Sequence, residues 1–163
     1  MPEPESLWDF ALRVYARDGV EETCIALQDT WRADIPVLLW ALWTGAQGHR
    51  LSAADIKAAV AGVEVWQTRV VGPIRQVRRA LRQPGPLTPA LESDLQSVRA
   101  EMQKVELNAE RRELEYLATA AVGAASEPGT ATMSANLVAY LDFLGVPAGG
   151  RGAVPVLVDA ASD

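Results

Sequence analysis

A row of five arginines is the strongest local concentration of charge in the sequence. Arg75, Arg78, Arg79 and Arg82 have the i, i+3, i+4, i+7 spacing of one helix stripe, and Arg69 precedes them. Guanidinium groups donate paired hydrogen bonds to carboxylates and phosphates. This arginine ridge therefore predicts either structural ion pairs or a site for an acidic partner or another anion.

Acidic residues on the next predicted helix are the candidate partners of the ridge. They are Asp94, Glu101, Glu106 and Glu110. If the two helices pack antiparallel about a turn near residue 86, Arg78 lies near Asp94, and Arg69 lies near Glu101 or Glu106. Exposed pairs of this kind contribute only about 0–1 kcal/mol each, so we expect them to set the register.

Nucleic acid is the least favoured partner of the ridge. The chain has 15 lysines and arginines against 21 acidic residues, a net charge of −6, so it repels phosphate overall. No aromatic residues are interleaved among the arginines for stacking on bases.

Nucleophiles and metal ligands are scarce. Cys24 and His49 are the single cysteine and the single histidine, so they exclude a zinc site and an intrachain disulfide. Cys24 falls on a predicted apolar stripe, where a cysteine usually packs as a small hydrophobic residue. We therefore expect no catalytic centre, no metal and no cofactor, although a Cys–His pair stays an alternative.

Five tryptophans are many for 163 residues. Large rings most often fill a core, but they also line ligand pockets and interfaces. The candidate pocket residues are Trp8, Trp40, Trp43 and Trp66. They would form an apolar site for a small ligand or a lipid.

The apolar spacing predicts an all-α bundle that positions these groups. The expected helices are at about 6–18, 20–32, 35–47, 53–83, 89–122 and 135–145. The first three form one module, in which the third is apolar all round and therefore central. The fourth and fifth carry heptad repeats and form a long antiparallel αα-hairpin, kinked at Pro73. We expect one domain over 1–147 and a flexible tail over 148–163, with a short strand at 154–158 as the alternative.

Several residues have the character of helix ends. Ser6 and Ser134 are predicted N-caps, and Ser52 with Asp55 resembles a capping box. Gly145 is predicted to close the last helix in a Schellman motif.

The longest apolar run has about nine residues, from Ile35 to Trp43. A membrane helix needs about 20. The acidic start of the chain does not resemble a secretory signal. We therefore expect a cytoplasmic protein with no membrane contact.

Several motifs in order resemble a known family. They include Leu7-Trp-x-Phe-Ala, Cys24-x-x-Leu-Gln-Asp, Trp66-x-x-x-Val-Val-x-Pro-Ile-Arg-x-x-Arg-Arg-x-Leu and Glu106-Leu-x-Ala-Glu-Arg. Over residues 7–117 the chain resembles an all-helical proteobacterial family described as a domain of unknown function. The resemblance implies a bacterial cytoplasmic protein and supplies no activity.

These observations favour a non-enzymatic interaction or adaptor protein whose partner is another protein or a second copy of itself. The alternative is a small-ligand or lipid-binding bundle that uses the tryptophans. A third hypothesis is anion or nucleic-acid binding through the arginine ridge.

Overall fold

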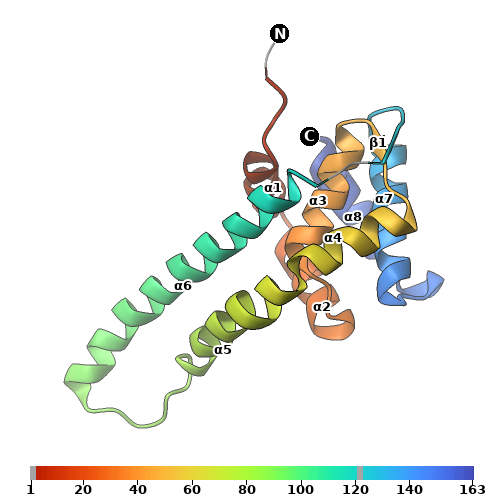
Figure 1. Cartoon of the computed structure of the whole chain (residues 1–163). Helices are drawn as coiled ribbons and strands as arrows, with labels where there is room; N and C mark the ends of the chain where they lie inside the picture. The colour runs from red at the N-terminus through yellow and green to blue at the C-terminus, as the bar shows by residue number, and fades with distance from the viewer. Residues whose placement is uncertain (1–2, 121–122) are drawn as a thin grey trace. The chain divides into compact units, whose positions relative to one another are not determined.

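The computed structural model describes residues 3–120 and 123–163 and divides into two compact units (Figure 1). The core unit consists of Met1–Val60 and Leu114–Asp163, and the hairpin unit consists of Ala61–Glu113. The boundaries between the two units fall inside two helices, after Val60 and after Glu113.

The predicted all-α class is confirmed. The strands in the described part of the chain are the two-residue segments β1 (His49–Arg50) and β2 (Ala124–Ala125), which pair antiparallel. None of the helices within 3–120 and 123–163 is long and apolar enough to cross a membrane.

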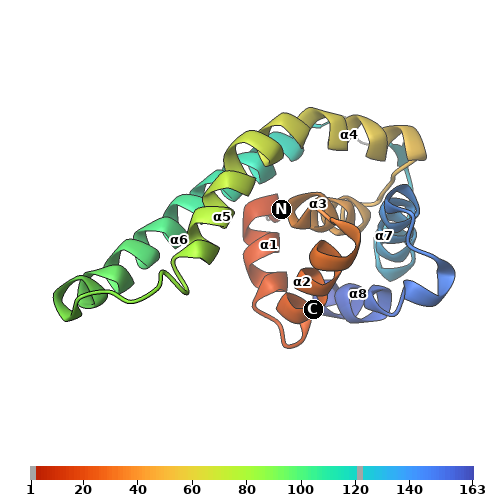
Figure 2. The same cartoon turned by 90° about the horizontal axis from the view of Figure 1, so that it is seen from below.

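The core unit is a set of helices around α3. Its helices are α1 (Leu7–Tyr15), α2 (Val20–Trp31), α3 (Ile35–Ala46), the first part of α4 (Ala53–Trp66), α7 (Thr130–Leu144) and α8 (Ala153–Ser162). The residues of α3 from Pro36 to Leu42 are all buried, as expected for a helix without a polar face. Helices α1, α7 and α8 contact α3, and Figure 2 shows them around it.

Helices α3 and α7 make the most extensive helix–helix contact of the core unit. At Gly45, an added Cβ atom would lie 2.6 Å from the backbone nitrogen of Met133. Glycine is therefore required at this crossing because the two backbones leave no room for a side chain.

A buried asparagine ties α7 to α3 and β1. The Asn136 side chain accepts a hydrogen bond from Leu51 N at 2.9 Å. Its amide nitrogen donates to the carbonyl oxygens of His49, at 2.8 Å, and Ala41, at 3.2 Å. Asn136 is fully buried, so these bonds hold the segment after α3 in a fixed position.

The hairpin unit begins inside α4. After α4 come a π-helical segment, η1 (Gln67–Val71), then α5 (Gly72–Ala80) and α6 (Pro89–Leu117), which leaves the unit after Glu113. The predicted kink at Pro73 is realised as η1, in which Gly72 N donates to Gln67 O. Pro73 has no N–H to bond the carbonyl four residues earlier, and the wider turn lies directly before it.

Most of the predicted helix ends are confirmed. Ser6 Oγ accepts from Asp9 N at 3.1 Å. Ser52 and Asp55 bond each other's backbone N–H, as a capping box requires. Gly145 closes α7 in a Schellman motif, in which Val146 N donates to the carbonyl oxygen five residues earlier, at 2.9 Å.

Two predictions at the C-terminal end are wrong. Helix α7 begins at Thr130, four residues before Ser134, and its first turns bury Thr132. The segment 148–163 is not a flexible tail or a strand, because it contains the 3₁₀ turn η2 (Ala148–Gly150) and α8. Small residues suggested flexibility, but the apolar positions recur at helical spacing and give α8 a buried stripe. The predicted helix end at residue 122 lies outside the described residues.

Candidate functional site

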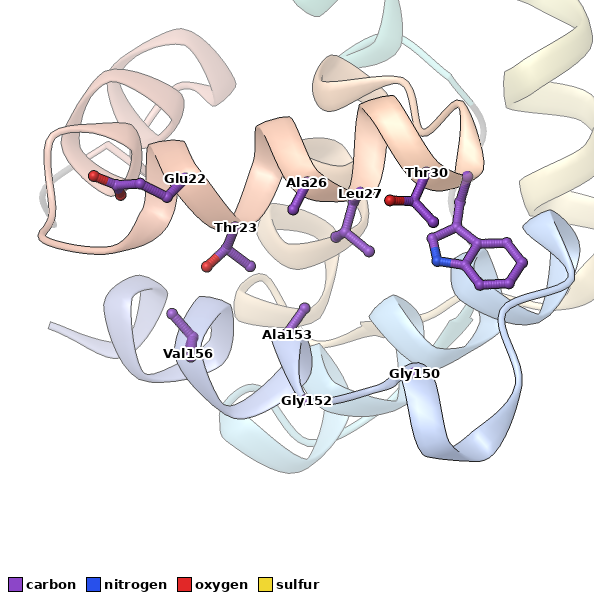
Figure 3. A pocket seen from close by; sticks show the side chains of 10 residues that line it. Glu22, Thr23, Ala26, Leu27, Thr30, Gly150, Gly152, Ala153 and Val156 are labelled. Carbon is purple, nitrogen blue, oxygen red and sulfur yellow. The ribbon is translucent and has the colours of Figure 1, made fainter.

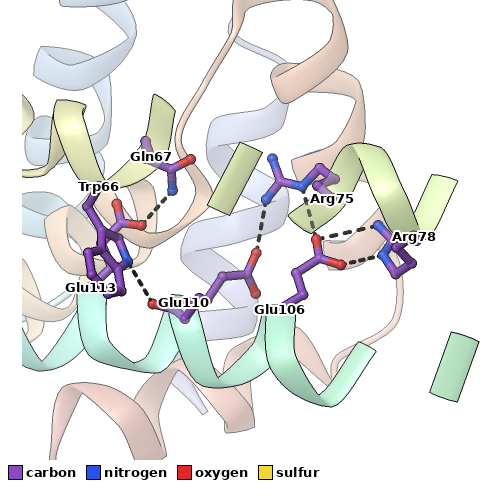
Figure 4. A network of polar contacts seen from close by, with 8 residues as sticks. Trp66, Gln67, Arg75, Arg78, Glu106, Glu110 and Glu113 are labelled. Atoms are coloured by element: carbon purple, nitrogen blue, oxygen red, sulfur yellow. Dashed lines mark hydrogen bonds and ion pairs between the residues drawn. The ribbon is translucent and has the colours of Figure 1, made fainter. Parts of the chain in front are cut away.

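Two members of the arginine ridge form a network with two glutamates inside the hairpin unit (Figure 4). Arg75 Nε lies 3.0 Å from Glu106 Oε1, and Arg75 Nη2 lies 2.9 Å from Glu110 Oε1. Arg78 Nε donates to the other oxygen of Glu106. The arginine side chains are only 15% and 16% exposed, and the Glu106 side chain is 10% exposed. The four groups therefore neutralise one another in a largely water-excluded position between α5 and α6.

The network shifts the pKa values of Glu106 and Arg75. Burial alone would raise the pKa of Glu106, but hydrogen bonds from Arg78 and Arg75 and their positive charges bring it below its ordinary value. Burial alone would lower the pKa of Arg75, but its bonds and charge interactions with Glu106 and Glu110 raise it above the usual value. Glu106 and Arg75 are therefore both charged at neutral pH, and together with Arg78 and Glu110 they form an ion-paired clamp between α5 and α6.

A second set of polar contacts lies next to η1. Trp66 Nε1 donates to Ala109 O at 3.0 Å, and Gln67 Nε2 donates to Glu113 Oε2 at 2.5 Å (Figure 4). The Glu113 side chain is among the most buried charged groups described. These bonds join the start of the hairpin to the end of its long helix.

The predicted register of the hairpin is wrong. Arg78 meets Glu106, which is 12 residues beyond the expected Asp94. The prediction assumed a helix to residue 83 and a tight turn, whereas α5 ends at Ala80 and a non-helical connection runs along the free end of α6 (Figure 1). Helix α5 therefore lies opposite the middle of α6, and Asp94 and Glu101 are exposed.

The other ridge residues differ from the clamped pair. Arg69, Arg79 and Arg82 are exposed at the surface. The ridge is thus divided between a structural inner part and an outer part.

The covered side of each hairpin helix is rotated by less than one residue from the predicted heptad positions, and on α6 the predicted positions Leu95, Met102 and Ala109 stay covered. On α6 the covered positions are Leu95, Met102, Glu106, Ala109 and Glu113, which recur every three or four residues. Val98 and Val105, which belong to the apolar heptad row of the same helix, are instead 46% and 48% exposed. On α5, Val77 is exposed while Arg78 is partly buried.

This rotation gives the hairpin unit two different sides. The two helices run antiparallel and are rotated in the same sense, so the residues that leave the seam lie on one side of the pair. The charged side carries Arg75, Arg78, Glu106 and Glu110, as their ion pairs show. The opposite, apolar side carries Val77, Leu91, Val98 and Val105.

The four candidate pocket tryptophans differ in their burial and belong to both units. Trp40 is fully buried in α3, and Trp8 and Trp43 are half-buried. The Trp43 indole N–H donates to Glu5 O at 2.9 Å. Trp66 belongs to the hairpin unit. The fully buried ring of Trp40 is part of the apolar interior of the core unit.

A shallow groove of about 420 Å³ lies between α2 and α8 (Figure 3). It is lined mainly by small and apolar side chains, namely Thr23, Ala26, Leu27, Thr30, Ala153 and Val156. Trp31 and Glu22 also line the groove. The sequence reasoning missed this groove because it treated the segment that forms α8 as a tail.

The single cysteine is buried, which disfavours its thiolate. Cys24 is fully buried in α2, and burial raises the pKa of its thiol to about 12. His49 lies in β1. The alternative of a Cys–His pair therefore lacks a reactive thiolate.

The chain is thus an all-α protein with a compact core unit and an antiparallel helical hairpin unit. The family model described as "Protein of unknown function (DUF2390)" matches residues 6–117, and the chain belongs to this family. The predicted resemblance to a family of unknown function is thereby confirmed. No curated protein and no solved structure matches the chain.

Proposed function

We propose that the protein is an interaction protein that binds a protein partner along the apolar side of its hairpin unit. The observation that carries the proposal is the exposure of this side. Leu91, Val98 and Val105 are each about half exposed and lie seven residues apart on α6, and Val77 of α5 lies on the same side.

Single exposed hydrophobic residues are ordinary on a protein surface. A row that repeats every seven residues along one helix is different, because it is half of a coiled-coil seam. Contiguous exposed apolar surface of this kind marks interaction sites. The free end of α6 also extends beyond α5, so a partner helix has access to it (Figure 1).

The clamp supports this proposal because it fixes which side of α6 faces α5. Arg75 and Arg78 bond Glu106 and Glu110 on the charged side, and this arrangement turns Val98 outward. An anion or nucleic-acid site on the ridge is less well supported, because two of its five guanidinium groups already bond carboxylates inside the chain.

Site-specific photo-crosslinking in cells of the source organism tests the proposal. A photoreactive phenylalanine analogue replaces Val98 in one strain and Leu107 in another. Leu107 is equally exposed on α6 but lies on the opposite face, so it is a matched control. We expect a discrete protein adduct from position 98 and none from position 107. The absence of an adduct at 98, or the same adducts at both positions, would refute the proposal.

A second candidate function is binding of a small apolar ligand in the groove between α2 and α8. Its volume and its lining of Ala26, Leu27 and Val156 next to an indole ring suit such a ligand. An environment-sensitive dye, anilinonaphthalene sulfonate, is a suitable probe. Ala26→Trp, which fills the groove, is expected to remove the dye's fluorescence gain, and an unchanged gain would place the dye elsewhere.

A further inference from the structure

The charge along the edge of the apolar side specifies the kind of partner, provided that the proposed function holds. Asp94 and Glu101 are exposed and flank Val98, four residues before it and three residues after it. Side chains at these spacings are neighbours on a helix surface. We infer that the partner segment is an amphipathic helix with an apolar stripe and with lysines or arginines beside that stripe.

The helical form of the partner follows from the spacing of the apolar side. Leu91 and Val105 are 14 residues apart on a continuous helix, which corresponds to about 21 Å at the rise of an α-helix. A stripe of this length with one exposed apolar residue per two turns matches the seam of a second helix packed alongside. An extended peptide would instead seek an open strand edge, which α5 and α6 do not offer.

The lysines or arginines inferred on the partner helix follow from the two acidic residues beside the apolar side, Asp94 and Glu101. An oppositely charged residue on the partner would lie next to Asp94 and another next to Glu101, because both occupy the g position of a coiled coil when Leu91, Val98 and Val105 are at d. A second copy of this chain fits less well. Two α6 helices packed antiparallel about Val98 would place Asp94 of each copy opposite Glu101 of the other, and like charges disfavour that pairing.

The test uses the full-length protein and two synthetic peptides of about 20 residues. Both peptides have leucines at heptad positions a and d; one has lysines at e and g, and the other has glutamates there. Peptide binding is followed by fluorescence anisotropy. We expect the lysine peptide to bind about fivefold more tightly than the glutamate peptide at low salt, as two exposed ion pairs allow. Added salt should reduce this ratio.

Two pairs of variants locate the effect. Asp94→Asn combined with Glu101→Gln should remove the preference, whereas Asp18→Asn combined with Glu21→Gln makes the same charge change on exposed residues of the core unit and should retain it. Val98→Asp should abolish binding of both peptides, and Leu107→Asp should leave it unchanged.

The outcomes separate this inference from the proposed function. Equal binding of both peptides that is lost in Val98→Asp would overturn the charge inference and leave the interaction surface standing. A preference for lysine that persists in the Asp94, Glu101 double variant would also overturn it. If neither peptide binds, or if sedimentation shows a dimer that Val98→Asp dissociates, the basic-helix partner is refuted.

Discussion

The substitution Asn136→Asp tests whether one buried amide holds the core unit together. It changes a nitrogen to an oxygen and adds a charge, with almost no change in volume. Asn136 is fully buried and makes three hydrogen bonds, two of which use its amide nitrogen as the donor. In the variant, a carboxylate oxygen would replace the amide nitrogen. It would lie about 3 Å from the carbonyl oxygens of His49 and Ala41, with no hydrogen between them.

The expected loss of stability in Asn136→Asp follows from these contacts. Each buried polar group that loses its partner costs about 1–3 kcal/mol. Two donor bonds are lost, so the free energy of unfolding of the core unit should fall by about 4 kcal/mol, the middle of that range for two groups. A protonated carboxyl restores one donor. The folded state therefore raises the pKa of the new group, and the destabilisation should be smallest below pH of about 4 and should grow as the pH rises above it.

Urea unfolding followed by the reactivity of Cys24 is the appropriate assay. Cys24 is buried in the core unit, so its labelling by a disulfide reagent reports unfolding of that unit. Asn108→Asp is the matched control, because Asn108 is exposed on α6 and the same chemical change there should alter stability by less than about 0.5 kcal/mol. A loss below about 1 kcal/mol for Asn136→Asp, or equal losses for both variants, would refute the reasoning.

Three further predictions concern other contacts. Gly45→Ala should destabilise the core unit by about 2 kcal/mol because its Cβ would meet the backbone of α7, whereas Gly149→Ala, with open space around it, should be neutral in the same urea titration. Glu106→Gln should destabilise the hairpin unit by about 2 kcal/mol, measured by hydrogen exchange of α5 and α6. Because its pKa is lowered in the folded state, the contribution of Glu106 is present above its unfolded pKa of about 4.3 and is lost as the pH falls further, a loss that the Gln variant should not show. Native Cys24 should resist alkylation at pH 8 for as long as the core unit stays folded; rapid stoichiometric labelling would contradict its burial.

Local signals in the sequence were sufficient for most of the core unit. The wholly apolar α3 could only be a central helix, and the caps at Ser6 and Ser52 follow from side chains that bond the adjacent backbone. Such features depend on a few neighbouring residues. The contacts of Asn136 and Gly45 did not follow from the sequence, because each depends on a helix about 85 or more residues away in the chain.

The hairpin shows why long-range pairing is harder to predict. The heptad pattern correctly indicated two antiparallel helices, and Glu106 and Glu110 were among the predicted partners of the ridge. The register depended on where α5 ends, and the sequence did not show that Ala80 is its last residue. An error of a few residues at one helix end moves every opposing pair along the other helix.

The rotation of the seam has a physical cause in the clamp itself. If apolar burial alone decided the packing of the two helices, Val98 and Val105 would lie in the seam between them. The structure instead covers Glu106 and Glu113, whose charges are bonded by Arg75, Arg78 and Gln67. A buried ionic network contributes little net stability, but breaking it is costly, so it selects one arrangement among several that have similar apolar burial. The same network that fixes the hairpin thus keeps an apolar side open, and an open seam of heptad spacing is what a helical partner requires.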